Sequence, residues 1–249
     1  MSTATAPAPV PDPTVRKSPM PAAPPPPFVG FPAAAAVILG ELAENNNTPW
    51  FAAHRVEYES LVADPARGLV VEVARALRRH VPELRAEPRP GGSILRPRRD
   101  ARFNLRAPLR PHLEVWWWEG AGPSRDHPGF FFRLEPRRLL MGGGVRVLPP
   151  DQLARFRAAV CDNERGRVLQ AILHRLRRAG WELRGRTLRR RPAGGEGEER
   201  ADLLLHSGLW VETDALPQGT VHDPALVAEL VAAFRRLLPL HRWLLELWP

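Results

Sequence analysis

The sequence contains very little of several residues that mark familiar protein classes. Lys17 is its only lysine and Cys161 its only cysteine. A single cysteine excludes an internal disulfide and a metal site built on several cysteines. No basic stretch followed by an apolar one opens the chain, and no apolar run reaches the roughly 20 residues that span a bilayer. We therefore expect a soluble, cytoplasmic protein without a membrane partner.

Well-known catalytic motifs are also missing. The chain has no HExxH pair of histidines, and no serine or cysteine lies in a recognised nucleophile motif. The glycines at 142–144 lack the Lys-Ser/Thr of a phosphate-binding loop, so we expect a tight turn or a bulge there, with a backbone anion nest as the alternative. The sequence consequently indicates no cofactor and does not decide whether the protein is an enzyme.

Arginine dominates the charge of the chain. The formal net charge is +9, and a guanidinium group is permanently protonated and pairs well with carboxylates and phosphates. An anionic small molecule or a nucleic acid is therefore an expected partner. The alternative is a compositional preference for arginine over lysine that has no functional meaning.

Composition divides the 249 residues into a tail and one domain. Residues 1–27 are rich in proline and alanine and have few side chains suited to a core, so we expect a disordered tail. Residues 28–249 suit a single domain with a sizeable core. The sequence contains no internal repeat, and it leaves the oligomeric state open.

Helical spacing and strand alternation predict an α+β domain. Helices are expected at residues 33–44, 49–61, 64–80, 150–161, 165–179, 223–238 and 240–248, the last two separated by Pro239. Strands are expected at residues 93–98, 112–118, 129–135, 138–141 and 209–213, with a small hairpin around Gly185. Because several strands follow one another without helices between them, we expect a mixed, mostly antiparallel sheet flanked by helices.

Residues 94–118 combine more charge and aromatic surface than any other stretch. In an extended strand, Arg96, Arg98 and Asp100 would point to one side and Arg99 to the other. Arginines beside irregular, proline-containing backbone are typical of ligand sites, so we predict an arginine-lined pocket for an anion. The predicted ligand-binding residues are Arg96, Arg99, Asp100, Arg102, Arg106 and Arg110, together with Asn46 and Tyr58. The alternative is a structural Arg–Asp pair that closes a turn.

Acid–base chemistry has three weak candidates in the same segment. His112 and Glu114 share a strand face, and Asp100 completes the candidate catalytic set. A carboxylate beside a histidine raises the pKa of the imidazole toward the working pH. A metal ion would need a further ligand, for which His127 is the only nearby candidate, so no metal site is predicted.

Two other functions compete with the pocket. A nucleic-acid-binding module would use the basic residues at 96–110 and 184–191, and one of the tryptophans at 116–118 would stack on a base or sugar. A structural or interaction protein would bind no ligand and leave its arginines in water. The favoured role of the tryptophans is core packing, with Trp116 and Trp118 on one face of the sheet and Trp117 on the other.

Three patches of the sequence are similar to a known family. They are LAENNNTPWF at residues 42–51 with Tyr58 after it, RPRRDARF at residues 96–103 with Pro108 after it, and HPGFF at residues 127–131, which leads to the glycines at 142–144 and to Pro149. Their order and spacing resemble a bacterial and fungal family of conserved hypothetical proteins, the DUF2461 family, over residues 31–248. The resemblance implies a single α+β domain and no particular reaction, cofactor or partner.

The chain departs from that family pattern at two positions. The family has a lysine-containing run and a Tyr-Lys pair where this chain has residues 104–110, and the tyrosine position is Leu109 here. A lysine position in the C-terminal part is Ser207. If the family residues transfer protons, this chain lacks those groups; if they bind an anion, Arg106 and Arg110 can replace them in part.

Overall fold

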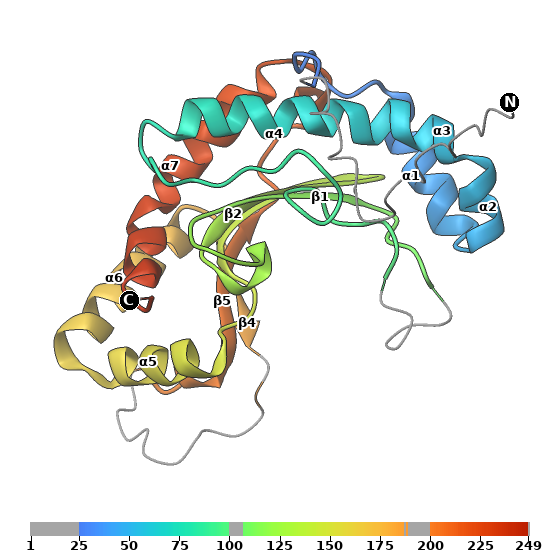
Figure 1. The fold of residues 1–249 in the computed structure, drawn as a ribbon. Helices are drawn as coiled ribbons and strands as arrows, with labels where there is room; N and C mark the ends of the chain where they lie inside the picture. Colours follow the sequence, from blue (N-terminus) through green and yellow to red (C-terminus); the bar gives the residue numbers. More distant parts are fainter. Residues whose placement is uncertain (1–24, 100–106, 187, 189–199, 249) are drawn as a thin grey trace, which may run out of the picture.

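A five-stranded antiparallel sheet lies at the centre of the protein (Figure 1). The computed structural model describes residues 25–99, 107–186, 188 and 200–248. Its strands are β1 (Leu113–Trp118), β2 (Gly129–Glu135), β3 (Arg138–Val145), β4 (Glu182–Arg186) and β5 (His206–Thr213), in the spatial order β1-β2-β3-β5-β4. Every neighbouring pair is antiparallel. The α+β class is confirmed, and the described sheet is wholly antiparallel rather than mixed.

Helices from both ends of the chain cover one face of this sheet. The long helices are α1 (Ala34–Glu44), α4 (Asp64–Leu77), α5 (Pro150–Cys161), α6 (Asn163–Arg178) and α7 (Leu226–Leu245). α1 contacts β2, α4 contacts β1, and α7 contacts β2 and β3. Figure 1 shows α4 above the sheet and α7 along its left side. No helix within the described ranges is long and apolar enough to cross a bilayer.

Shorter helical segments join these elements. Between α1 and α4 the chain forms α2 (Thr48–Ala53), α3 (Arg55–Tyr58) and a π-helical turn, η1 (Glu59–Ala63). The 3-10 helices are η2 (Ser124–Asp126), η4 (Leu203–Leu205) and η5 (Gln218–His222). The expected helices at 49–61 and 64–80 are therefore a nearly continuous helical run that widens into a π-turn between them.

The main core lies between the helices and the sheet. Trp117 and Phe130 contact the ring of Phe234 in α7 at centroid distances of 5.6 and 5.1 Å. Phe132 stacks on Phe31, which comes from the segment before α1. All five rings are buried. Burial of such large rings is a major source of the stability of the fold.

The opposite face of the sheet is more polar. Side chains alternate along a strand, so Glu114 and Trp116 point away from Trp117, and their partners in the register are Arg133 and Phe131. Trp116 therefore lies on the face opposite Trp117, as the alternation predicted. We call this face the charged face, and its members are Glu114, Trp116, Phe131, Arg133, Leu140, Arg146 and Trp210.

Two predicted strand features were wrong. Residues 93–98 form no regular strand but meet residues 109–115 through isolated bridges, Ile94 to Val115 and Arg98 to Leu109. Prolines in both segments cannot donate to a ladder and so interrupt it. The glycines at 142–144 are not a turn but continue β3. A Cβ atom on Gly142 would lie 2.5 Å from the ring of Phe131, so glycine makes room for that ring.

Two expectations about breaks in the chain were also wrong. α7 continues through Pro239, because this residue is exposed and its missing N–H leaves no buried acceptor, while Leu237 and Leu240 on either side are buried. Gly185 does not turn a hairpin but lies inside β4, at a register irregularity against β5. The predicted tail at residues 1–27 lies almost entirely outside the described residues.

Candidate functional site

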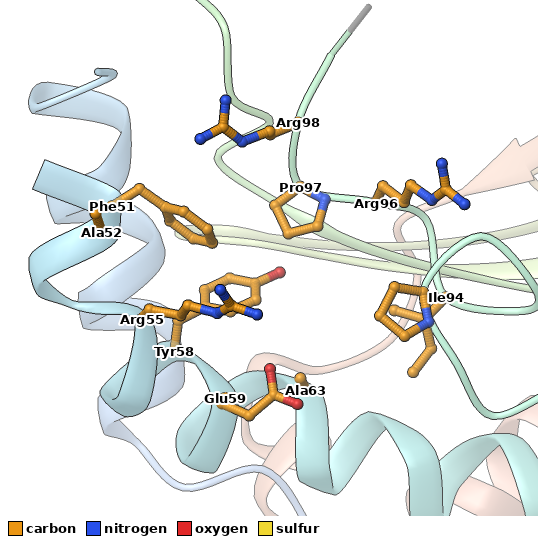
Figure 2. Close-up of a pocket in the computed structure, with 11 residues that line it drawn as sticks. Phe51, Ala52, Arg55, Tyr58, Glu59, Ala63, Ile94, Arg96, Pro97 and Arg98 are labelled. Carbon is orange, nitrogen blue, oxygen red and sulfur yellow. The ribbon is translucent and has the colours of Figure 1, made fainter. Parts of the chain in front are cut away.

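A pocket of about 440 Å³ lies between the helical run after α1 and the segment at residues 90–98 (Figure 2). We call it the helix-side pocket. Its lining residues are Phe51, Ala52, Arg55, Tyr58, Glu59, Ala63, Pro90, Ile94, Arg96, Pro97 and Arg98. Its volume is within the range of small-molecule sites, and most of its wall is carbon.

Local sequence explains the helical wall of this pocket. The side chain of Asn47 caps α2 by accepting a hydrogen bond from the N–H of Trp50 at 2.9 Å, and Pro49 lies in the first turn. The π-helical turn η1 follows Tyr58 and contributes Glu59 and Ala63 to the wall. Such turns are frequent at functional sites, and nothing in the sequence pattern predicted this one.

Tyr58 carries the most enclosed polar group of the pocket. Tyr58 is 5% exposed, and its hydroxyl group points into the pocket (Figure 2). Within the described part of the chain this hydroxyl makes no hydrogen bond. Burial, and to a lesser extent the negative charge of Glu59, raise the pKa of Tyr58 above its ordinary value. The phenol therefore stays protonated at neutral pH and can both donate and accept.

Guanidinium groups outnumber carboxylates around the pocket. Arg55, Arg96 and Arg98 form no ion pair with any described residue, whereas Glu59 pairs with Arg67. Figure 2 shows Arg55 extending toward the middle of the pocket, with Arg96 and Arg98 at its rim and their guanidinium groups directed outward. The pocket thus combines an apolar wall with an excess of positive charge.

The charged face holds a second polar constellation, centred on Glu114. Glu114 is 5% exposed; its Oε1 accepts a hydrogen bond from Trp116 Nε1 at 2.7 Å, and its Oε2 accepts one from Arg133 Nε at 2.7 Å. Burial alone would raise the pKa of Glu114, but Arg146, Arg133 and Trp116 outweigh it and hold the pKa below its ordinary value. The carboxylate therefore stays ionised and has little capacity to exchange a proton.

Arg146 lies against three aromatic rings of the charged face. Its guanidinium carbon is 4.6, 4.8 and 5.0 Å from the ring centroids of Phe131, Trp210 and Trp116, which is cation–π geometry. Its Nη2 is 3.1 Å from Glu114 Oε2 but poorly aligned for a hydrogen bond, and its buried Nε has no partner within the described ranges. Aromatic faces thus replace part of the hydration that burial removes.

His112 corrects an expectation about its pKa. Burial, followed by the charge of Arg133, lowers the pKa of His112 to about 4, and Arg110 and Arg99 add to the effect. Glu114 opposes the shift, but its charge is already shared between Arg133 and Arg146. The expected rise in the pKa of His112 was therefore wrong, and the imidazole is neutral at pH 7.

The structure divides the predicted ligand-binding residues between the two sides of the segment at residues 94–99. Arg96 and Tyr58 line the helix-side pocket. Arg99 does not, and its charge acts on Arg110 and His112 on the other side. Three predicted residues lie outside the described residues, and they are Asp100, Arg102 and Arg106. Ligand binding by any of them stays a prediction.

Asn46 and Arg110 fasten the backbone around the pocket. Asn46 Oδ1 accepts from the N–H of Leu109 at 2.9 Å, and its Nδ2 donates to the carbonyl of Leu109 at 3.1 Å. Arg110 Nη1 donates to the carbonyls of Arg96 and Arg98 at 3.0 and 2.6 Å. Leu109, which stands at the family's tyrosine position, is buried. These contacts give Asn46 a structural role and hold Arg110 in place through its Nη1.

Sequence reasoning missed several site residues. Arg55 precedes Tyr58 by three residues, which places both on one helical face, so a signal for it existed. Arg133 and Arg146 had none, because their contact with Glu114 depends on strand register. No group of three or more His, Cys, Asp or Glu side chains suited to a metal ion occurs in the described ranges.

Comparison with known proteins agrees with this architecture. The model of the conserved hypothetical protein family DUF2461 matches residues 35–243, which is most of the chain. The chain therefore belongs to this family. Neither the curated proteins nor the solved structures contain a match. The family match covers both the helix-side pocket and the charged face.

Proposed function

We propose that this member of the DUF2461 family binds a small anionic ligand, bearing a carboxylate or a phosphate, in the helix-side pocket. The observation that carries the proposal is the hydroxyl of Tyr58, which belongs to a buried side chain, faces the pocket and makes no hydrogen bond to a described residue. The hydroxyl oxygen is accessible from the pocket and can both donate and accept, so it is available to bond with a ligand.

The walls suggest the shape of the ligand. Phe51, Ile94 and Pro97 offer apolar contact, so the ligand carries an apolar, ring-like body. Arg55 extends toward the same space and has no carboxylate partner among the described residues, and its planar fork suits a carboxylate or a phosphoryl group. Arg96 and Arg98 add long-range attraction for an anion at the rim.

Nucleic-acid binding has less support. Of the second basic run, at residues 184–191, Arg184 already pairs with Glu212 through its Nε at 2.9 Å and also with Glu182. An arginine held by two carboxylates offers less charge to a phosphate backbone. The test below therefore includes a result that would indicate nucleic-acid binding.

The test is isothermal titration calorimetry with matched probes. Phenyl phosphate and benzoate carry a ring and an anionic group, whereas benzyl alcohol carries the ring alone. We expect the two anions to bind and benzyl alcohol to bind more weakly. Because a hydrogen bond to a charged group contributes about 1.5–3 kcal/mol, Arg55→Gln should weaken the anions by about tenfold or more.

The matched control is Arg75→Gln, which removes an exposed arginine of α4 outside the pocket. It should leave the affinity for both anions unchanged. Equal losses in the two variants, or no binding by either anion to the wild-type protein, would overturn the proposal. Tight binding of single-stranded DNA that weakens steeply with salt and survives Arg55→Gln would favour the nucleic-acid function instead.

A further inference from the structure

The backbone at residues 94–99 separates the pocket from a second group of arginines. Arg98 forms a bridge with Leu109, and the N–H of Arg99 donates to the carbonyl of Pro108 at 2.8 Å. Successive residues of such an extended segment point to opposite sides. Arg96 and Arg98 accordingly line the helix-side pocket, whereas Arg99 lies outside its lining and belongs with Arg110 and His112.

The one carboxylate at the centre of the charged face is already fully used. Trp116 donates to one oxygen of Glu114, and Arg133 and Arg146 share the other. Arg133 also lies 3.5 Å from Glu135 Oε1 through its Nη1, so Glu114 and Glu135 together balance Arg133 and Arg146. Glu114 therefore has no oxygen left to neutralise a further arginine.

Arg99 and Arg110 approach this cluster without an ion pair to any carboxylate of the described residues. The side chain of Arg110 donates to the carbonyls of Arg96 and Arg98, which are neutral acceptors. The Nε of Arg99 is buried and has no hydrogen-bond partner within the described part of the chain. Burial, and next the charge of Arg99, lower the pKa of Arg110. The positive charges of Arg99 and Arg110 therefore repel each other. A bound anion would offset this repulsion.

We propose that Arg99, Arg110, His112 and Arg133 form a second site, which binds a tetrahedral oxyanion of the phosphate or sulfate class. Arg99 and Arg110 supply charge-assisted hydrogen bonds, whereas Arg133, which Glu114 and Glu135 hold in place, adds longer-range attraction. The imidazole of His112 is neutral and therefore offers one donor and one acceptor without adding to the repulsion. The oxyanion is either a free ion or the terminal group of a larger phosphate ester.

The test uses sulfate, which stays doubly charged over the whole pH range examined. The imidazole of His112 is followed by NMR, with His112→Gln assigning its signal, in sulfate and in chloride at equal ionic strength. The groups that act on His112 are Arg133, Glu114, Arg110 and Arg99. A bound anion offsets the arginines, so sulfate should raise the pKa of His112 from about 4 toward its ordinary value.

A second measurement uses inorganic phosphate in calorimetry. Arg99→Gln should weaken phosphate by about tenfold, the effect of losing roughly 1.4 kcal/mol of interaction, while the control Arg75→Gln should change nothing. Identical pKa values of His112 in sulfate and chloride would overturn the second site, and so would a sulfate effect that persists in full in Arg99→Gln. Displacement of sulfate by phenyl phosphate in the Arg55→Gln variant would identify an ester as a ligand; its absence would identify the free ion. Failure of the helix-side pocket leaves these readouts untouched, because they do not depend on Arg55 or Tyr58.

Discussion

On one side of residues 94–99, the arginines of the helix-side pocket have no carboxylate partner among the described residues. On the other side, Arg146 of the charged face lies over aromatic rings and shares Glu114 with Arg133. The first group keeps its hydration, so it needs no internal partner and remains available to an anion. The second group loses much of its hydration and is stable only because a carboxylate and three ring faces replace the water.

The difference teaches how position decides the role of an arginine. A buried ion pair contributes little net stability, yet breaking it leaves an uncompensated charge in a poorly solvated place. An exposed pair is weak in either case. We therefore expect substitutions on the charged face to act on stability and those at the pocket to act on binding.

The largest effect should come from removing one carboxylate on each side. Glu114→Gln leaves Arg146, whose side chain is 20% exposed, without this carboxylate, and it leaves Arg133, 19% exposed, with only the longer contact of 3.5 Å to Glu135. The free energy of unfolding should fall by about 3–5 kcal/mol. Glu59→Gln breaks a pair whose side chains are 45% and 24% exposed and should cost less than about 1 kcal/mol. Urea unfolding of the two variants measures both values, and similar losses would contradict the contrast.

The next effect is a pH dependence of stability that arises at His112, on which Arg133 and Glu114 of the charged face act. The folded pKa of His112, about 4, lies below the ordinary value of 6.5, so the unfolded chain binds more protons between these pH values. Stability should therefore rise with pH across this window, and the contribution, about 3 kcal/mol at about 1.4 kcal/mol for each pH unit between the two pKa values, should be fully present above pH 6.5. Urea unfolding at several pH values checks it. In His112→Gln the slope should be smaller, and an unchanged slope would remove His112 as its source.

The smallest effect on stability should come from Tyr58→Phe. The hydroxyl makes no hydrogen bond among the described residues, so its removal should change the free energy of unfolding by less than about 0.5 kcal/mol. The affinity for phenyl phosphate should nevertheless fall by about two- to tenfold, because a neutral hydrogen bond contributes about 0.5–1.5 kcal/mol. A large loss of stability with unchanged affinity would make Tyr58 a structural residue. It would also contradict the expectation that substitutions at the helix-side pocket act on binding and those on the charged face act on stability.

Strand and helix positions followed from local patterns wherever packing agreed with them. The alternating run Gly129–Glu135 became β2, and the division of the tryptophans at 116–118 between two faces followed from the period of a strand. Predictions from local sequence patterns failed where packing against residues distant in the sequence determined the secondary structure. The ring of Phe131 needs the space that the glycines leave in β3, and packing on both sides of Pro239 keeps α7 intact.

The candidate sites were predictable only in part, for the same reason. Arg96 and Tyr58 were chosen for their charge and polarity, and the structure places both at one pocket. The pairing of Arg133 and Arg146 with Glu114 depends on register and on how a strand ends, which no local pattern encodes. The sign of the pKa shift of His112 was missed because it depends on those same arginines.

Sequence alone determined the class of the fold, the basic character of residues 94–118 and the alternation that sends neighbouring arginines to opposite sides. These follow from side-chain period and charge, which are properties of the chain itself. Tertiary structure decided which arginines keep their water and which must share Glu114. That choice depends on burial, and burial is produced by segments far apart in sequence: α4 and α7 on one face of the sheet, and the rings of Phe131 and Trp210 on the other.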